Sequence, residues 1–288
     1  LLDSGDTKAA NCVSCHSVHN IESPQIPTSS VYALNLPGTC AECHADPDYM
    51  AGYGIATNQY DHYVKSVHGV ALLERGDIGA PACNDCHGNH GAVPPEVASI
   101  SAVCGLCHAL IAEEFAMSPH DTVFEKADFP KCETCHSNHL IMKPELHWVG
   151  TTDSSLCINC HDANDGTAGF RTAEQIYNSL SDLYAAHGKA AAKVDEAEYK
   201  GMMITDLRFQ LREVKQSLIK ARTVVHAFNA ARIIEVVEPG LLEAAKVYEA
   251  AVQEVDEYYF RRKGLGVATL IITILAIALY LKIRSIEK

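Results

Sequence analysis

The chain has no cysteine outside one repeated five-residue frame, C-x-x-C-H. All 12 cysteines of its 288 residues fall into six such frames, so none is left over. This excludes most other uses of cysteine. A disulfide framework gives no reason for a histidine after every second cysteine. Zinc fingers place their histidines beyond a spacer of roughly a dozen residues, and a thioredoxin-like site would need a single frame within a βαβ unit.

Residues 1–170 also lack the regular hydrophobic stripes that build an ordinary core. They are rich in Gly, Pro, Ser, Asn and Asp, with turn signals every few residues. Such a composition is by itself typical of disordered chains, because too little apolar surface is available to offset the loss of chain entropy. The region therefore needs apolar material from outside the polypeptide in order to fold.

Basic side chains are scarce in the same region. Residues 1–170 hold 6 Lys and Arg against 21 Asp and Glu, whereas residues 171–288 hold 17 against 15. Nucleic acid is a poor partner for so acidic a region. A redox partner with a basic docking face and a plain solvated acidic surface are equally compatible with this charge.

What the chain does contain is the attachment signature of c-type haem. In C-x-x-C-H the two thiols form thioethers with the porphyrin vinyl groups, and the histidine becomes the proximal axial ligand of the iron. Six frames predict six covalently bound haem c groups. The predicted attachment residues are Cys12, Cys15, Cys40, Cys43, Cys83, Cys86, Cys104, Cys107, Cys132, Cys135, Cys157 and Cys160. The predicted proximal ligands are His16, His44, His87, His108, His136 and His161.

Six porphyrins would supply the apolar mass that residues 1–170 lack. We therefore expect a mainly α fold with extensive loops and almost no sheet. Residues 1–170 are predicted to form a hexahaem cytochrome c domain whose core is the haems, with short helices around the attachment sites.

The frames form three copies of a two-haem unit. The first, third and fifth frames carry a further histidine three residues after the proximal one, at His19, His90 and His139. The porphyrin would separate this histidine from its own iron, so we predict that it binds a neighbouring haem. An aromatic-x-x-Ser-x-His pattern precedes later frames at His68 and His120, and these are also predicted distal ligands.

A low-spin electron-transfer haem takes two strong-field axial ligands, so six haems need six distal histidines. The sixth is either His187, which stands in the phase of the repeat, or His226 in "KARTVVHAFNAARII". His62 and His147 are predicted to be surface residues or to hydrogen-bond haem propionates.

From Arg171 onward the composition changes to Ala, Leu, Glu and Lys with helical periodicity. Three helices are expected, at 172–199, 204–237 and 241 onward. Gly201 and the sequence "EPG" at 238–240 mark the expected breaks. The expected buried stripe of the last helix is Leu241, Ala245, Tyr248, Val252, Val255 and Tyr259.

The stretch from Thr172 to Ala251 resembles the C-terminal helices of the pentahaem nitrite reductase and hydroxylamine oxidoreductase superfamily. The resemblance lies in "LREVKQSLIKARTVVHAFN", where a long helix leads into a histidine. In that superfamily the tail histidine is a distal haem ligand. The resemblance therefore implies that His226, rather than His187, is the sixth distal ligand.

The chain then enters a membrane-spanning sequence. Gly264 to Leu281 is 18 residues without a charge, which spans about 27 Å as a helix. We predict a helical tail over 171–262, a transmembrane anchor over 263–283 and a short cytoplasmic end over 284–288. Basic residues flank the span equally on both sides and do not fix its orientation.

Haem attachment takes place outside the cytoplasmic membrane, which decides the orientation. The chain is predicted to lie in the bacterial cytoplasmic membrane, with its haem domain in the periplasm. No signal peptide precedes "LLDSGDTK", so the chain is expected to be processed or incomplete.

With its anchor, the chain looks like the membrane-attached multihaem subunits of bacterial respiratory complexes. The resemblance implies an electron-transfer subunit without catalytic residues of its own. It would relay electrons between a quinol-oxidising membrane partner, or other respiratory subunits, and periplasmic redox proteins.

Two alternatives stay open. A nitrite or hydroxylamine reductase needs one open axial position, which is often marked by C-x-x-C-K, whereas all six frames here end in histidine. An extracellular cytochrome filament would suit six haems, but the apolar span argues against it.

Overall fold

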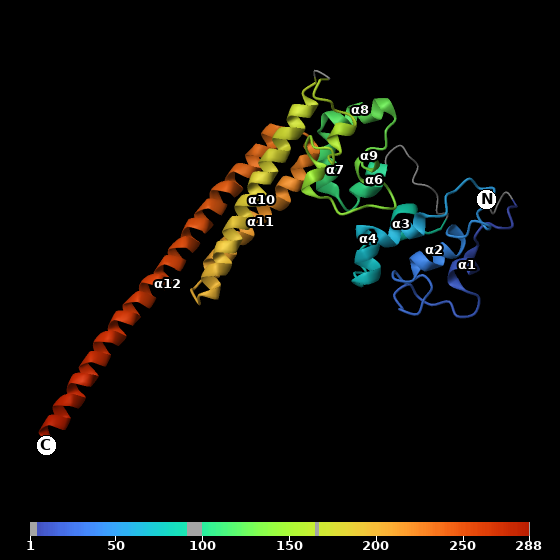
Figure 1. Cartoon of the computed structure of the whole chain (residues 1–288). Helices are drawn as coiled ribbons and strands as arrows, with labels where there is room; N and C mark the ends of the chain where they lie inside the picture. Colours follow the sequence, from blue (N-terminus) through green and yellow to red (C-terminus); the bar gives the residue numbers. More distant parts are fainter. Residues whose placement is uncertain (1–4, 91–99, 165–166, 288) are drawn as a thin grey trace. The chain divides into compact units, whose positions relative to one another are not determined.

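The computed structural model describes residues 5–90, 100–164 and 167–287 (Figure 1). Every regular element in these ranges is helical, and none of these residues forms a strand. The predicted mainly α fold with extensive loops is thereby confirmed. The chain divides into two compact units, Leu1–Trp148 and Val149–Lys288. The sixth frame lies in the second unit, and the domain boundaries expected from the sequence stay predictions.

The first unit consists of short helices joined by loops. Four of these helices end on a predicted proximal histidine, so the frame itself forms a helical turn. Few apolar side chains of this unit are buried among the described residues: Met50, Ala71, Leu72, Ala82, Phe115 and Phe124. The helices are α1 (Cys12–His16), α2 (Leu36–His44), α3 (Gln59–Lys65), α4 (Val67–Gly69), the π-helical turn η2 (Val70–Glu74), α5 (Cys83–His87), α6 (Ile100–Gly105), α7 (Ala109–Ala116), α8 (Pro119–Ala127), α9 (Glu133–His136) and the 3₁₀ turn η3 (Leu146–Trp148).

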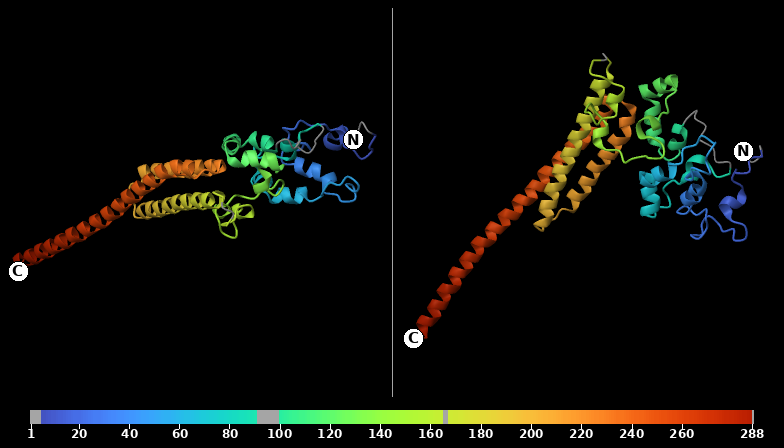
Figure 2. Two further views of the ribbon diagram at one scale, coloured as in Figure 1. Left: turned by 90° about the horizontal axis from the view of Figure 1, so that it is seen from above. Right: turned by 45° about the vertical axis from the view of Figure 1, so that its right-hand side comes forward.

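The second unit is dominated by three long helices that run side by side (Figures 1 and 2). Small and branched apolar residues recur along their facing sides, which is the pattern of a helix bundle. Leu183, Val194, Val214, Ile233 and Val247 are fully buried between them. The elements are the 3₁₀ turn η4 (Cys157–Asn159), α10 (Gly169–Tyr199), α11 (Thr205–Val224), the 3₁₀ turn η5 (Val225–Ala227) and α12 (Ala230–Ile286).

The expected break between the second and third tail helices was wrong. The chain breaks at Phe228, which has a left-handed φ of 47°, and Asn229 then caps α12 through hydrogen bonds from the amides of Ala231 and Arg232. Pro239 lies inside α12. Its ring faces solvent, and burial on both sides of it outweighs the one backbone hydrogen bond that proline removes.

Close packing at residue 240 explains why a glycine follows Pro239. A Cβ at this position would lie 2.8 Å from Cβ of Ser217 and 3.0 Å from Cδ1 of Leu183, so only glycine lets α12 approach α10 and α11 so closely. The expected buried stripe is therefore one position out of phase up to residue 252, whereas the expected burial of Val255 is confirmed. The buried residues in this part of α12 are Gly240, Ala244, Val247, Ala251 and Val255.

The C-terminal part of α12 leaves the bundle and continues alone (Figure 1). Its most apolar 18-residue window has a mean hydropathy of 2.4, and none of that window is buried in the protein. A core helix would be covered by protein atoms, whereas this segment is long and apolar enough to cross a membrane.

Candidate haem-binding site

Three pairs of predicted ligands face each other in the first unit. The imidazole rings of His16 and His90 have centroids 6.3 Å apart and planes inclined by 26°. Those of His87 and His139 are 5.9 Å apart and nearly parallel, at 7°. In each pair, a proximal histidine meets the extra histidine of a later frame.

The third pair joins His108, the proximal histidine of the fourth frame, to His68 from the aromatic-x-x-Ser-x-His pattern. Their ring centroids are 6.3 Å apart, with an interplanar angle of 30°. Burial and the neighbouring His108 lower the pKa of His68, which favours the neutral imidazole that a metal requires.

These separations fit one iron between each pair of rings. Because a metal–imidazole bond is about 2.0–2.1 Å long and the ring centre lies roughly 1 Å behind the nitrogen, two imidazoles on opposite sides of one ion have centres about 6 Å apart. Among the residues that the structure describes, no group of three or more His, Cys, Asp or Glu side chains could hold a metal ion. A two-histidine axial set suits an iron whose other four ligands come from a porphyrin.

A turn with a positive φ separates the two histidines of each C-x-x-C-H-x-x-H sequence, and it is strained where the residue is serine. Ser17, Gly88 and Ser137, directly after the proximal histidines, have φ values of 61°, 80° and 57° with extended ψ. This region of backbone conformation is almost restricted to glycine. The Ser17 and Ser137 hydroxyls each donate to a carbonyl three residues later, and the turn leads the chain away before the second histidine.

Buried serines position the other distal candidates. Ser66 caps α4, which carries His68; it accepts a hydrogen bond from the Gly69 amide at 3.0 Å and donates one to the Tyr63 carbonyl at 2.7 Å. Because the Tyr63 carbonyl lies where a Cβ would stand, residue 69 must be glycine.

Ser118 repeats the cap in α8. It accepts a hydrogen bond from the amide of Asp121 at 3.3 Å, in the first turn of the helix that carries His120. The aromatic-x-x-Ser-x-His pattern is therefore a buried cap that fixes a histidine in the first turn of a helix.

Thiol contacts show that frames one to five adjoin in chain order. The Cys40 and Cys83 thiols are neighbours, and their interaction lowers the pKa of Cys40 to about 7 and raises that of Cys83. The same interaction between Cys104 and Cys132 raises the pKa of Cys104 and lowers that of Cys132, which places frames four and five side by side.

The remaining links are electrostatic. Burial, followed by the neighbouring Cys40, raises the pKa of Cys15, and burial followed by Cys104 raises that of Cys86. Because these thiols would form thioethers with the haem vinyl groups, they would not titrate in the haem-loaded chain. Their proximity to one another is what shows that the frames adjoin.

The sixth frame is held close to the start of α10. A Cβ at Gly169 would overlap the imidazole ring of His161. Glycine at this position therefore lets the proximal histidine lie directly against the helix. No pattern in the sequence marks Gly169, because its role depends on the position of the His161 ring.

The two candidates for the sixth distal ligand differ in their surroundings. Nδ1 of His226 lies 3.1 Å from the carbonyl oxygen of Thr223, which can only accept a hydrogen bond, so Nδ1 carries the proton. Its Nε2 is then the atom able to bind a metal, as in many metal-binding histidines. His187 lies within α10, where burial, followed by Lys215, lowers its pKa. The ligand role of His226 stays a prediction that this geometry supports.

Two of the predicted ligands, His19 and His44, face no second imidazole in the described ranges. In the second frame His44 is exposed, and the described residues place no other imidazole against its ring; the same holds for His19. His136 has the Trp148 ring 5.8 Å away, and the edge of His120 meets Phe124. Trp148 was not singled out in the sequence, because a lone aromatic carries no ligand pattern.

The two histidines expected at the surface have local polar contacts. His62 Nε2 lies 3.4 Å from Nδ2 of Asn58. His147 Nδ1 lies 3.3 Å from the Glu145 carboxylate, and nearly half of its side chain is exposed. Neither contact requires a haem.

One comparison with known proteins bears on this site. A family model described as "Doubled CXXCH motif" matches residues 120–166, which include the fifth and sixth frames. No curated protein and no solved structure matches the chain. The family match indicates covalent binding of haem c in a multihaem c-type cytochrome, for which electron transfer is the general role.

Proposed function

We propose that this chain is a membrane-anchored hexahaem cytochrome c that relays electrons in a respiratory complex. The haem body would face the periplasm, and the apolar end of α12 would cross the bacterial cytoplasmic membrane. A quinol-oxidising membrane protein is the proposed donor, and periplasmic redox proteins are the proposed acceptors.

The observation that carries the proposal is the set of three imidazole pairs at 5.9 to 6.3 Å. Two strong-field ligands close both axial positions of an iron, which suits electron transfer and leaves no position for a substrate. We accordingly assign His90 to the first haem, His139 to the third and His68 to the fourth.

The order of the frames supports a relay. Frames one to five adjoin in sequence through their thiols, so haems attached to them would be neighbours along one path. The protein's part is then to ligate, bury and space the haems, while the haems carry the electrons.

The test is a haem count combined with an EPR spectrum of the oxidised, detergent-solubilised protein. Six haems per chain by the pyridine haemochrome assay and low-spin ferric signals from the paired sites are expected. Fewer than six haems would reject the hexahaem assignment. High-spin signals equivalent to four or more haems would reject at least one of the three assigned pairs.

A second candidate function rests on the second frame. Its His44 is exposed and faces no imidazole of the described residues, so in this candidate function the second haem would keep one axial position open. Beside it, with Cys43 as a neighbour, Tyr49 donates to the Lys8 carbonyl at 2.5 Å, and Tyr53 donates to Asp6 at 2.7 Å. A reductase of small nitrogen oxides would need such an open iron with proton-bearing groups nearby.

The two candidates differ in the number of high-spin haems and in turnover. A pure relay gives no stoichiometric high-spin signal and no reduction of nitrite or hydroxylamine. One high-spin haem per chain, together with turnover that His44→Ala abolishes, would favour the reductase. One high-spin haem without turnover would leave the relay in place with an exposed second haem.

A further inference from the structure

The bundle and the apolar span meet in a short boundary segment of α12. Val255 is the last buried residue of this helix, and the uncharged run begins at Gly264. The residues between them include two tyrosines and three consecutive basic residues, "RRK" at 261–263. If α12 crosses a membrane, this segment lies at the level of the lipid headgroups.

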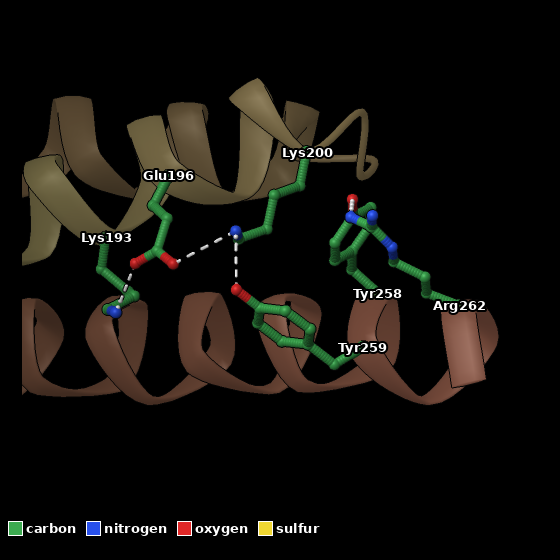
Figure 3. Close-up of polar contacts among 6 residues, drawn as sticks. All are labelled: Lys193, Glu196, Lys200, Tyr258, Tyr259 and Arg262. Atoms are coloured by element: carbon green, nitrogen blue, oxygen red, sulfur yellow. Dashed lines mark hydrogen bonds and ion pairs between the residues drawn. The ribbon is translucent and has the colours of Figure 1, made fainter.

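The turn between α10 and α11 reaches the same level (Figure 3). Nζ of Lys200 donates a hydrogen bond to the Tyr259 hydroxyl at 3.1 Å, and it lies 5.2 and 4.8 Å from the ring centres of Tyr258 and Tyr259. The same Nζ lies 3.6 Å from the Glu196 carboxylate, and the hydrogen bond to Tyr259 is the main reason that the pKa of Lys200 is raised.

This turn exposes apolar side chains at its tip. Tyr199 is 92% exposed and Met203 is 87% exposed, and residues 199–204 include no acidic side chain. On α12, Phe260 is 73% exposed at a similar level. Exposed apolar and aromatic groups beside basic ones are typical of surfaces that enter the boundary between headgroups and acyl chains.

A small pocket next to the turn is lined by Tyr258, Arg261, Arg262 and Leu265. Arg262 donates to the Tyr258 hydroxyl at 2.9 Å, and no ion pair links it to a carboxylate in the described ranges. Arg261 is paired with Glu257 at 2.7 Å. Arg262 therefore keeps most of its donors for an external anion, and guanidinium groups bind phosphates in a bidentate manner.

From these contacts we infer that Arg262 binds the phosphate of an anionic phospholipid at the membrane end of the bundle, and that Arg261 and Lys200, which are paired with Glu257 and Glu196, add positive charge beside it. Leu265, the first apolar side chains of the span and the exposed tip of the α10–α11 turn would contact the acyl chains. This apolar wall distinguishes a lipid from free phosphate. The inference rests on the proposed membrane anchor.

The test uses the full haem-loaded chain, delipidated in detergent. Phosphatidylglycerol and phosphatidylcholine are titrated separately, and bound lipid is counted by native mass spectrometry. We expect retention of phosphatidylglycerol only. Each removed cation weakens binding to an anionic lipid by about five-fold, so R261Q/R262Q should lose about 25-fold. Lys246→Gln, an exposed lysine of α12 far from the span, is the matched control and should bind normally.

Three results would overturn the inference: equal retention of the two lipids, normal binding by R261Q/R262Q, or competition by millimolar inorganic phosphate alone. Haem spectra and far-UV circular dichroism of each variant establish that it folds. Carbonate extraction of native membranes separates the two proposals. If the wild-type chain is extracted like a peripheral protein, the anchor fails; if it stays in the membrane but binds no phosphatidylglycerol, only the lipid site fails.

Discussion

The two units of this chain obtain their interiors in different ways. In the described part of the first unit, six apolar residues are buried and histidine rings face one another across gaps that match an iron. In the second unit, twenty apolar residues are buried, mostly between three long helices. One unit is thus built to enclose a cofactor, while the other is stabilised by its own side chains.

This difference predicts opposite responses to loss of haem, the largest effect that we expect. When the full chain is produced without haem attachment, the first unit should unfold, because too few apolar side chains remain to offset its chain entropy. The bundle of α10, α11 and α12 should persist. Limited proteolysis with mass spectrometry would show cuts throughout 5–148 and protection over 169–260. Equal protection of both regions would contradict the comparison.

A smaller change should break one imidazole pair only. His139→Ala removes the ring that faces His87 at 5.9 Å, so one ferric haem should change from low to high spin while the haem count stays the same. EPR and the pyridine haemochrome assay measure the two quantities. His62→Gln is the control and should leave every low-spin signal in place. If His139→Ala left the spin states unchanged, the assignment of His139 to the third haem would be wrong.

Much of this was predictable from the sequence because haem attachment is covalent and needs a fixed spacing. The frames determine where each porphyrin would be attached. The extra histidines recur with the repeat, so they could be predicted as ligands. The pairing could not be predicted, because His16 meets His90 and His68 meets His108 only through the path of the chain between them. The strained turns at Ser17 and Ser137 were equally hidden, since serine gives no signal for a positive φ.

The tail was harder to place in detail although its helices were evident. "EPG" is a helix-stop signal by local rules, and the close approach at Gly240 overrides it. The phase of α12 was ambiguous because apolar residues stand at adjacent positions, as in Leu241–Leu242 and Ala244–Ala245. Only the contact with Leu183 and Ser217 selects which of the two stripes is buried.

The side-chain core of the second unit gives the next prediction. Leu183 has no exposed surface, so Leu183→Ala should lower the free energy of unfolding of the bundle by about 2–5 kcal/mol. Leu242, which is 66% exposed, is the matched control. Leu242→Ala should change the free energy of unfolding of the bundle by less than about 0.5 kcal/mol. Hydrogen exchange of the α10 to α12 amides reports this unit separately. Similar losses in both variants would argue against the bundle core.

The smallest effect concerns the strained turns of the first unit. Ser137 adopts a φ of 57° in a region where Gly88 stands at the equivalent place, and such strain costs roughly 1–3 kcal/mol. Ser137→Gly should remove part of it, at the loss of the hydrogen bond to the Leu140 carbonyl, and should stabilise the first unit slightly. Gly88→Ala should destabilise it. Thermal unfolding followed in the haem absorption bands compares the two, and a shift of the same sign in both would contradict the strain.

The unbroken course of α12 has a consequence for the orientation of the molecule. Residue 233 in the bundle and the residues of the apolar span belong to one helix. The rotation of the bundle about the helix axis, relative to the span, is therefore set by the number of residues between them. One residue inserted near Tyr259 would rotate the bundle by about 100° and raise it by about 1.5 Å relative to the span. If the apolar end of α12 crosses a membrane as proposed, the direction in which the bundle faces is therefore set by the number of residues between its core and that apolar segment.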